Sequence, residues 1–397
     1  MYAPSTPSKQ FRRAPRRLIH ATALAAALAA AQAGAVEIQS GDWTVDVGGI
    51  VNAYATSVSC SGDAVGGPAI AGRGLGCSGE SSKTTIGNGL LPSGLVTKFK
   101  TSQDGLEIGG TIGIYAATAT SSGLAANSGV DVRQAFFTIG TAEAGTLKIG
   151  RDYGVFGSNP ILSDMTLLGA GAPVQGTQRG RVTLGHIGAG YTYLGTYGQM
   201  TYVSPVIGGG FTFTGALVSP VDSGVYASQA GPQYQAQLAW AGNGFKAWIG
   251  AKMQHFADAG AGTGGFAETA AEIGASYSAG PFAVLANYQE GKGLGILSDG
   301  DQGPVKGRNY FLQGTYKVSD KLKFGINYGE SRNQDDNARN TALNASFKSN
   351  ANLTAGLYYG LTKSITLAGE LGDTRSKDYL GNTAKMFGGS FGGIIFF

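Results

Sequence analysis

Hydrophobic and polar residues alternate along most of the chain from Trp43 onward, in segments of about ten residues. A period of two places successive side chains on opposite faces of a β-strand, so each segment predicts a strand with one apolar and one polar face. No stretch after the N-terminal region reaches about 18 uninterrupted apolar residues, so we expect no transmembrane helix. The clearest alternating segments are residues 43–51, 106–114, 245–252, 322–327 and 365–371.

The connections between these segments alternate in length. The short ones are rich in Gly, Pro, Asp, Asn and Ser, as tight hairpin turns require. Fifteen connections join sixteen predicted strands. The short turns are 101–105, 141–145, 204–209, 241–244, 278–281, 318–321 and 360–363, and the long loops are 59–84, 117–130, 152–190, 219–232, 256–267, 290–307, 331–349 and 373–384.

Short turns at one end, long loops at the other and an even number of strands of about ten residues are typical of outer-membrane barrels. A soluble β-sandwich or β-helix would also alternate, but gives no reason for connections that alternate so regularly in length. Aromatic residues near strand ends, such as Trp43, Tyr191, Tyr197, Trp240 and Tyr358, fit interfacial girdles. We therefore expect an all-β protein, a 16-stranded antiparallel transmembrane β-barrel.

The N-terminus has the pattern of a secretory signal peptide. Five basic residues between Lys9 and Arg17 precede a short apolar run, 18–31, and small residues suited to cleavage follow it. We assign residues 1–35 to the signal and 36–397 to the barrel domain. This predicts export to the outer membrane of a Gram-negative bacterium.

Removing the signal changes the charge of the chain. The 397 residues carry 29 bases and 25 acids, but five of the bases and none of the acids lie in residues 1–35. The remainder is close to neutral, so no overall basic field favours nucleic acid as a partner. Only 14% of the residues are charged and 67 are Gly, which suits a β-protein with many turns.

The two cysteines, Cys60 and Cys77, lie in one Gly/Ser-rich loop. An exported chain meets an oxidising periplasm, so we expect a disulfide that closes this loop. A zinc site would need more ligands than two cysteines. We expect no cofactor and no metal.

Two segments resemble a known family. Residues 133–140 (RQAFFTIG), a short turn and residues 145–151 (GTLKIGR) are similar to the hairpin of strands 4 and 5 that leads into loop 3 of Gram-negative outer-membrane general porins of the 16-stranded, trimeric, β-proteobacterial type. Residues 198–205 (GQMTYVSP) resemble strand 6 of the same family. The resemblance in architecture covers about residues 43–397, and it implies a homotrimer.

The resemblance also implies that residues 152–190 are loop 3, folded into the lumen to form the pore constriction. A 16-stranded barrel leaves an aqueous channel, so something must restrict it to small solutes. Charge rings set ion selectivity, and bases outnumber acids modestly along the predicted pore wall, so we expect a weak anion preference. The predicted constriction residues are Lys98, Lys100, Arg133, Lys148, Arg151, Asp152, Asp164, Arg179 and Arg181.

The sequence thus predicts a porin for passive diffusion of small hydrophilic solutes and ions, surrounded by outer-membrane lipid and lipopolysaccharide. Asp335 and Asp336 could bridge divalent cations to lipopolysaccharide, but a solvated loop is the favoured interpretation. Two alternatives remain open: a substrate-selective channel for small organic anions, and a structural or adhesive barrel. Enzyme signals are poor. His186 is the one histidine near loop 3, and no nucleophile elbow accompanies it.

Overall fold

The computed structural model describes residues 35–119, 130–172, 183–224, 226–258, 264–335 and 346–397. The predicted signal, apart from Ala35, and the predicted site residues Arg179 and Arg181 lie outside the described residues. No described helix is long and apolar enough to cross a membrane.

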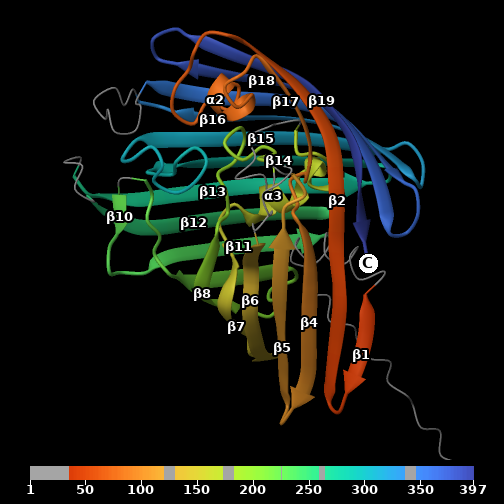
Figure 1. Cartoon of the computed structure of the whole chain (residues 1–397). Helices are drawn as coiled ribbons and strands as arrows, with labels where there is room; N and C mark the ends of the chain where they lie inside the picture. Colours follow the sequence, from red (N-terminus) through yellow and green to blue (C-terminus); the bar gives the residue numbers. More distant parts are fainter. Residues whose placement is uncertain (1–34, 120–129, 173–182, 225, 259–263, 336–345) are drawn as a thin grey trace, which may run out of the picture.

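Sixteen long strands form one closed antiparallel barrel, which confirms the predicted fold class. Each strand pairs with its neighbours in sequence, and β19 pairs with β2 from Ala384↔Gly62 to Phe396↔Ile50, which closes the sheet (Figure 1). The strands are β2 (Trp43–Gly62), β4 (Ser93–Gln103), β5 (Leu106–Ala116), β6 (Val130–Thr141), β7 (Gly145–Tyr153), β8 (Thr196–Val203), β9 (Phe211–Val218), β11 (Gln233–Gly242), β12 (Phe245–Asp258), β13 (Phe266–Ala279), β14 (Phe282–Lys292), β15 (Lys306–Lys317), β16 (Leu322–Asn333), β17 (Phe347–Gly360), β18 (Ile365–Asp378) and β19 (Thr383–Phe396).

Three short strands and three short helices complete the described chain. β1 (Val36–Ser40) forms a hairpin with the start of β2, β10 (Tyr226–Ser228) pairs with the end of β12, and β3 (Ser82–Gly87) pairs with the second half of β2. Residues 88–92 separate β3 from β4, which pairs with the first half of β2. The helices are α2 (Arg73–Gly76), α3 (Ser158–Ser163) and the 3₁₀ helix η1 (Met165–Leu168).

The short and long connections alternate as predicted. Two of the short turns have the backbone that hairpins with two-residue turns favour, with positive φ at both central residues: Asp104 and Gly105, and Asn243 and Gly244. Asp–Gly and Asn–Gly supply these conformations at low cost, and their twist matches that of the flanking strands. The seven predicted turns therefore form one end of the barrel and the eight long loops the other.

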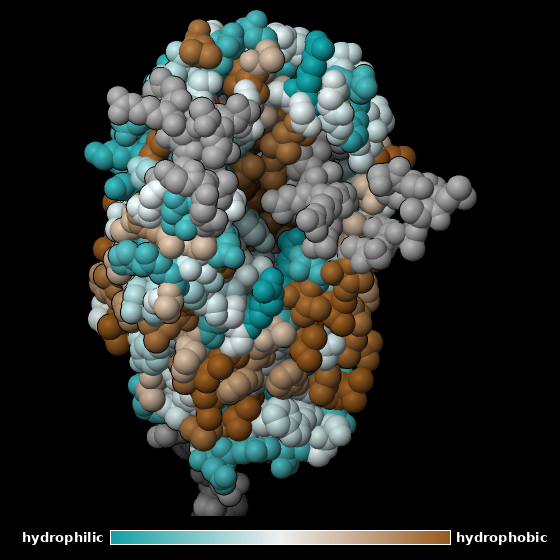
Figure 2. All heavy atoms as spheres, turned by 60° about the vertical axis from the view of Figure 1, so that its left-hand side comes forward, coloured by the Kyte–Doolittle hydropathy of each residue, from teal (hydrophilic) through white to brown (hydrophobic). Residues whose placement is uncertain are grey.

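The two faces of the barrel wall have opposite character. Outward positions are apolar and exposed, for example Ile249 and Ile273, whereas the intervening inward positions are polar and buried, for example Gln235 and Asn327. This arrangement is the inverse of a soluble protein and fits a wall with lipid outside and polar groups inside. Figure 2 shows hydrophobic residues gathered in patches on the outer surface.

The aromatic girdle was predicted correctly only in part. Trp43 packs against Phe99, and Trp240 against Phe245, near the short turns, with ring centroids 5.9 and 5.8 Å apart. By contrast, the side chains of Tyr191, Tyr197 and Tyr358 are buried. Sequence position near a strand end does not reveal which way a ring points, because one residue of register moves it to the other face.

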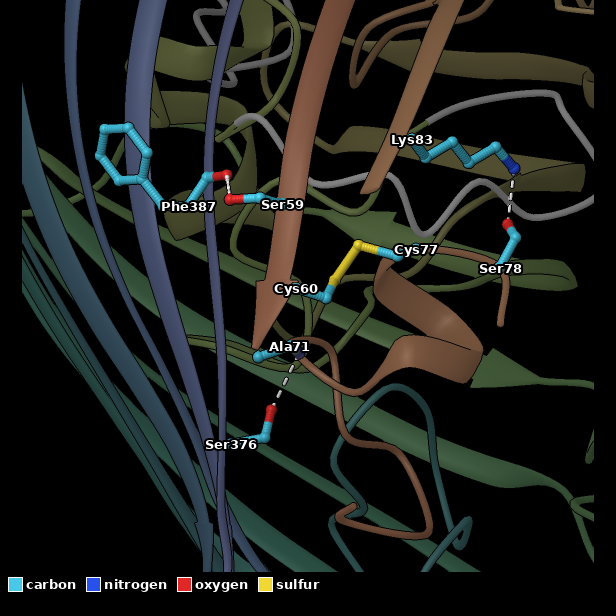
Figure 3. The surroundings of a disulfide bond; sticks show 8 residues. All are labelled: Ser59, Cys60, Ala71, Cys77, Ser78, Lys83, Ser376 and Phe387. Atoms are coloured by element: carbon cyan, nitrogen blue, oxygen red, sulfur yellow. Dashed lines mark hydrogen bonds between the residues drawn. A yellow bond between two sulfur atoms is a disulfide. The ribbon is translucent and has the colours of Figure 1, made fainter. Parts of the chain in front are cut away.

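The predicted disulfide joins Cys60, at the end of β2, to Cys77, just after α2 (Figure 3). Hydrogen bonds to two inward side chains anchor the loop that it closes: Ile70 N–H donates to Asn350 Oδ1, and Ala71 N–H to Ser376 Oγ. Ile70 and Cys77 are fully buried against Leu184, Ile187 and Ile296. The disulfide thus holds the first long loop onto a core shared with later loops.

Replacing both cysteines with serine should loosen this loop without opening the barrel. The loop ends are 17 residues apart, and closing a loop of that size removes about 3 kcal/mol of unfolded-chain entropy. We expect faster tryptic cleavage after the exposed Arg73, with unchanged heat-modifiable migration of the barrel. Wild-type protein under reducing conditions should behave like the variant. Equal cleavage rates of oxidised wild type and variant would contradict the prediction.

Candidate functional site in the connection between β7 and β8

The connection between β7 and β8, residues 154–195, is the longest in the described chain and carries α3 and η1. Side chains from the barrel wall satisfy its irregular backbone. Gln235 Oε1 of β11 accepts the N–H groups of Val155 and Phe156 at 2.6 and 2.9 Å. Gln313 of β15 accepts Met165 N–H at 2.7 Å and donates to the Ser163 carbonyl at 2.8 Å. Buried backbone groups require such partners, so these glutamines fix the path of the connection.

Further contacts come from strands on other parts of the wall. Gly171 N–H donates to Glu370 of β18, Gly190 N–H to Ser331 of β16, and Thr192 N–H to Gln289 of β14. The Tyr54 hydroxyl of β2 donates to the Leu168 carbonyl at 2.9 Å. The connection is therefore tied to β2 and β18, the two strands on either side of the closing strand β19, and to the middle strands β11 and β14–β16.

One approach is close enough to require glycine. A Cβ atom on Gly329 of β16 would lie 2.1 Å from the Ala189 carbonyl oxygen and 2.7 Å from Gly190 Cα. Both are backbone atoms that cannot rotate away. Gly329 thus lets the end of the connection rest directly on the wall.

Asp164 stands at the centre of a buried polar cluster inside the connection. Its carboxylate accepts from the Tyr191 hydroxyl at 2.6 Å, from Thr166 N–H at 2.9 Å and from Asn327 Nδ2 of β16 at 3.1 Å, and it lies 3.2 Å from His186 Nδ1. Burial acts to raise the pKa of Asp164. His186 and the hydrogen bonds from His186, Tyr191 and Thr166 outweigh burial, so the pKa lies below its ordinary value.

A partly enclosed cavity of about 80 Å³ lies between the connection and the wall. The connection contributes an apolar side that includes Ile161, Leu167 and Leu184, and residues 90–92 extend it. β5 and β6 contribute a polar side, with Tyr115, Arg133 and Gln134.

The polar side is an ordered network. Arg133 Nε donates to Asp131 at 2.9 Å, and its guanidinium lies 5.9 Å from the centroid of the Tyr115 ring. The Tyr115 hydroxyl donates to Gln134 Oε1 at 2.8 Å, and Gln134 Nε2 donates to Asp152 Oδ1 at 2.9 Å. Arg133 is therefore the cation of this network that lines the cavity.

The predicted constriction residues separate into groups. Arg133 lines the cavity, and Lys148 pairs with Asp152 on β7. Lys98 and Lys100 lie on β4 next to Asp46 of β2. Asp164 bonds to groups of the connection and to Asn327 instead of facing the bases.

Arg151 requires a correction. It shares the outward parity of Leu147 and Ile149, is exposed, and donates to the Val132 carbonyl and to Thr196 Oγ1. Arg151 was predicted to lie with Lys148 and Asp152 because it is close to them in sequence. It is an odd number of residues from each of them, so its side chain lies on the other face of the strand. It does not line the cavity.

Sequence reasoning missed the glutamines that hold the connection, Gln235, Gln289 and Gln313. The parity of their strands placed them on the inward face, and that signal was available. It did not reveal that these amides meet backbone groups of residues 155–192, because the partners are between 79 and 150 residues away in sequence.

Comparison with known proteins now identifies the family. The family described as Gram-negative porin matches residues 21–379, which is most of the chain. The chain belongs to the Gram-negative porin family. No curated protein matches the sequence.

Solved structures agree with the porin fold. The outer membrane channel DcaP of Acinetobacter baumannii is similar with a TM-score of 0.68 at 15% identity, over 91% of this chain and 99% of that one. The anion-selective porin of Comamonas acidovorans gives 0.63 at 18%, over 89% and 100%, and OmpF of Salmonella typhi gives 0.60 at 17%, over 90% and 100%. The porin is thus an outer-membrane channel protein.

Replacing Gln313 with leucine should release α3 and η1. The change leaves Met165 N–H and the Ser163 carbonyl without their partner, at a cost of about 1–3 kcal/mol for each group. We expect amide hydrogen exchange across residues 158–168 to accelerate by about tenfold or more. The matched control is Gln237→Leu on β11, because Gln237 Nε2 has no hydrogen-bond partner among the described residues. Equal acceleration in both variants would refute the role of Gln313.

Acid should weaken the Asp164 cluster. Because its folded-state pKa is lowered, its contribution is present above the unfolded value of about 3.9 and is lost as the pH falls through the folded value. Hydrogen exchange of residues 164–172 should therefore be faster at pH 3 than at pH 5, after correction for the intrinsic rate. Asp164→Asn should exchange fast at both pH values. A wild type without this pH dependence would contradict the assignment.

Proposed function

We propose that this porin forms a water-filled channel for passive diffusion of small hydrophilic solutes and ions, and that the β7–β8 connection turns into the barrel and narrows it. The observation that carries the proposal is the hydrogen bonding of the connection to inward side chains of β2, β11, β14, β15, β16 and β18. Bonds to so many separate strands of a closed barrel support a path of the connection across its interior. We propose that solutes pass the 80 Å³ cavity between the connection and the wall.

We propose that the channel has a weak preference for anions. Arg133 is the predicted base that lines the cavity, and Lys246 donates to the neutral Asn159 of α3. Among the other inward charges, Lys148 pairs with Asp152, and the buried Lys252 contacts both Glu268 and Asp299. The description of one structural neighbour as an anion-selective porin agrees with this sign. The bases Arg133 and Lys246 beside the connection support a modest selectivity of this sign.

A substrate-selective channel for small organic anions is the second candidate. The cavity faces Arg133 and Gln134 with the apolar side chains of Ile161, Leu167 and Leu184. Such a surface suits a solute that has an anionic group and a small apolar body. Saturable block of the chloride current by butyrate, but not by acetate, would favour this candidate over general diffusion.

Catalysis has little support. His186 and Asp164 form a His–Asp pair, but the imidazole is fully buried and packs on Phe311 with ring centroids 4.9 Å apart. A substrate cannot reach a ring enclosed in this way.

We also propose a homotrimer, in keeping with the family, which would close in three equal steps in a planar bilayer.

Replacing Arg133 with glutamine should reduce the anion preference. Refolded protein in a planar bilayer with a tenfold KCl gradient should give a reversal potential of the sign expected for a channel that prefers chloride. Arg133→Gln should move the ratio of chloride to potassium permeability toward one by about a factor of two, the scale of one partly screened charge. The matched control is Arg151→Gln, which removes an arginine from the outer face and should leave the ratio unchanged. Clear cation preference of the wild type would overturn the proposed selectivity.

A further inference from the structure

The outer face of β15–β19 changes character toward the ends that carry the long loops. Ile326, Leu353 and Leu371 are exposed apolar residues on adjacent strands. Next on the same outward parity come Tyr328 and Asp373, and then Glu330 and Arg375. The outermost pair of this parity is Arg332 and Lys377. The wall thus passes from apolar to aromatic to basic over a few residues.

A tyrosine pair marks the boundary between the apolar and charged zones. The rings of Tyr310 and Tyr328 lie 6.2 Å apart, and both hydroxyls donate to Glu330 Oε2. Tyrosine is enriched at the level of lipid headgroups, where an apolar ring meets a polar surface. The long loops face outward in such barrels, so this boundary belongs to the outer leaflet.

A hollow of about 550 Å³ lies in the charged zone. Four bases line it, and two acids, Glu330 and Asp373, lie among them. The hydroxyls of Tyr310 and Tyr328 donate hydrogen bonds to Glu330, and Asp373 pairs with Arg375 at 3.0 Å. The small side chains Ser349 and Ala351 leave the space between the strands open. The four bases are Arg332, Lys348, Arg375 and Lys377.

An apolar groove continues from the hollow along the outer wall. It has a volume of about 620 Å³ and shares Tyr328 and Leu353 with the hollow. Small residues on neighbouring strands, Ala275, Ala286 and Gly314, form part of it between Val284, Leu312 and Ile326. A basic hollow joined to an apolar groove is complementary to an amphipathic anion.

We propose that this surface is a specific binding site for a phosphorylated, acylated lipid of the outer leaflet. Its phosphate binds among Arg332, Arg375 and Lys377, and an acyl chain lies in the groove below. Arginine and lysine are the side chains that recognise phosphate, and arginine does so with paired donors. The groove favours a lipid over free phosphate. This site is separate from Asp335 and Asp336, for which a solvated loop is the favoured interpretation, and Asp336 lies outside the described residues.

The test measures binding of purified, refolded porin to lipid A bisphosphate in detergent by native mass spectrometry and thermal shift. The variant Arg332→Gln/Arg375→Gln/Lys377→Gln should weaken binding by at least about tenfold, which corresponds to ~1.4 kcal/mol. The control Lys317→Gln/Lys321→Gln/Lys363→Gln removes the same charge near the short turns, where all three side chains are exposed, and should bind like wild type. Equal losses in both variants would reduce the effect to non-specific charge and overturn the proposal.

Further experiments distinguish lipid binding from binding of other ligands and from misfolding of the variants. Inorganic phosphate at millimolar concentration should not compete with lipid A, and full competition would overturn the assignment to a lipid. Ala351→Leu fills the open space without changing charge and should also weaken lipid binding. Both binding variants should keep wild-type conductance, because the site lies on the outer wall. A conductance change together with unaltered lipid binding would contradict the proposal.

Discussion

Closure of the sheet is the constraint on which the rest of this porin depends. No water is available inside a bilayer to satisfy an open strand edge, so every backbone group of a spanning strand must bond to a neighbour. Here β19 meets β2 along thirteen paired residues, and at the end of the seam Gly49 and Phe397 exchange backbone hydrogen bonds, at 2.7 and 3.1 Å. The bare Cα of Gly49 leaves room for the Phe397 ring, because a Cβ there would lie 2.5 Å from it.

Closure also decides where each kind of side chain goes. Once the wall separates lipid from the interior, a period of two sends apolar residues outward and amides, hydroxyls and charges inward. The inward amides then act as anchors for loops. Gln235, Gln313 and Asn350 each bond to at least two groups of segments that would otherwise leave buried backbone groups unsatisfied. An irregular segment thus becomes a defined part of the structure, held by the wall and not by its own helices.

The division of the wall into an apolar outer face and a buried inner face also explains why the chain has few charged residues. A buried charge is costly unless it is paired and hydrogen-bonded. Lys252 accordingly contacts two carboxylates, and Asp164 collects several donors. Arg133 keeps a contact with Asp131 while it lines the cavity. Outside, the bases near Arg332 and Arg375 stand where lipid headgroups begin, at the level at which a charge can remain solvated.

By itself, the sequence determined the barrel. Alternation, turn chemistry and the lengths of the connections are local properties, and they were enough to predict sixteen strands and the unusual length of the connection after β7. Two cysteines in an exported chain were enough to predict the disulfide between Cys60 and Cys77. Parity also placed Lys148 on the inward face. The tertiary structure alone decided which inward residues meet. Arg133 and Leu184 line the same cavity, and Asp164 accepts a hydrogen bond from Asn327. These contacts form because closing the barrel and folding the connection bring together residues far apart in sequence. One residue of offset sent Arg151 outward, and the fold buried Tyr191, Tyr197 and Tyr358, which the sequence had suggested for the girdle.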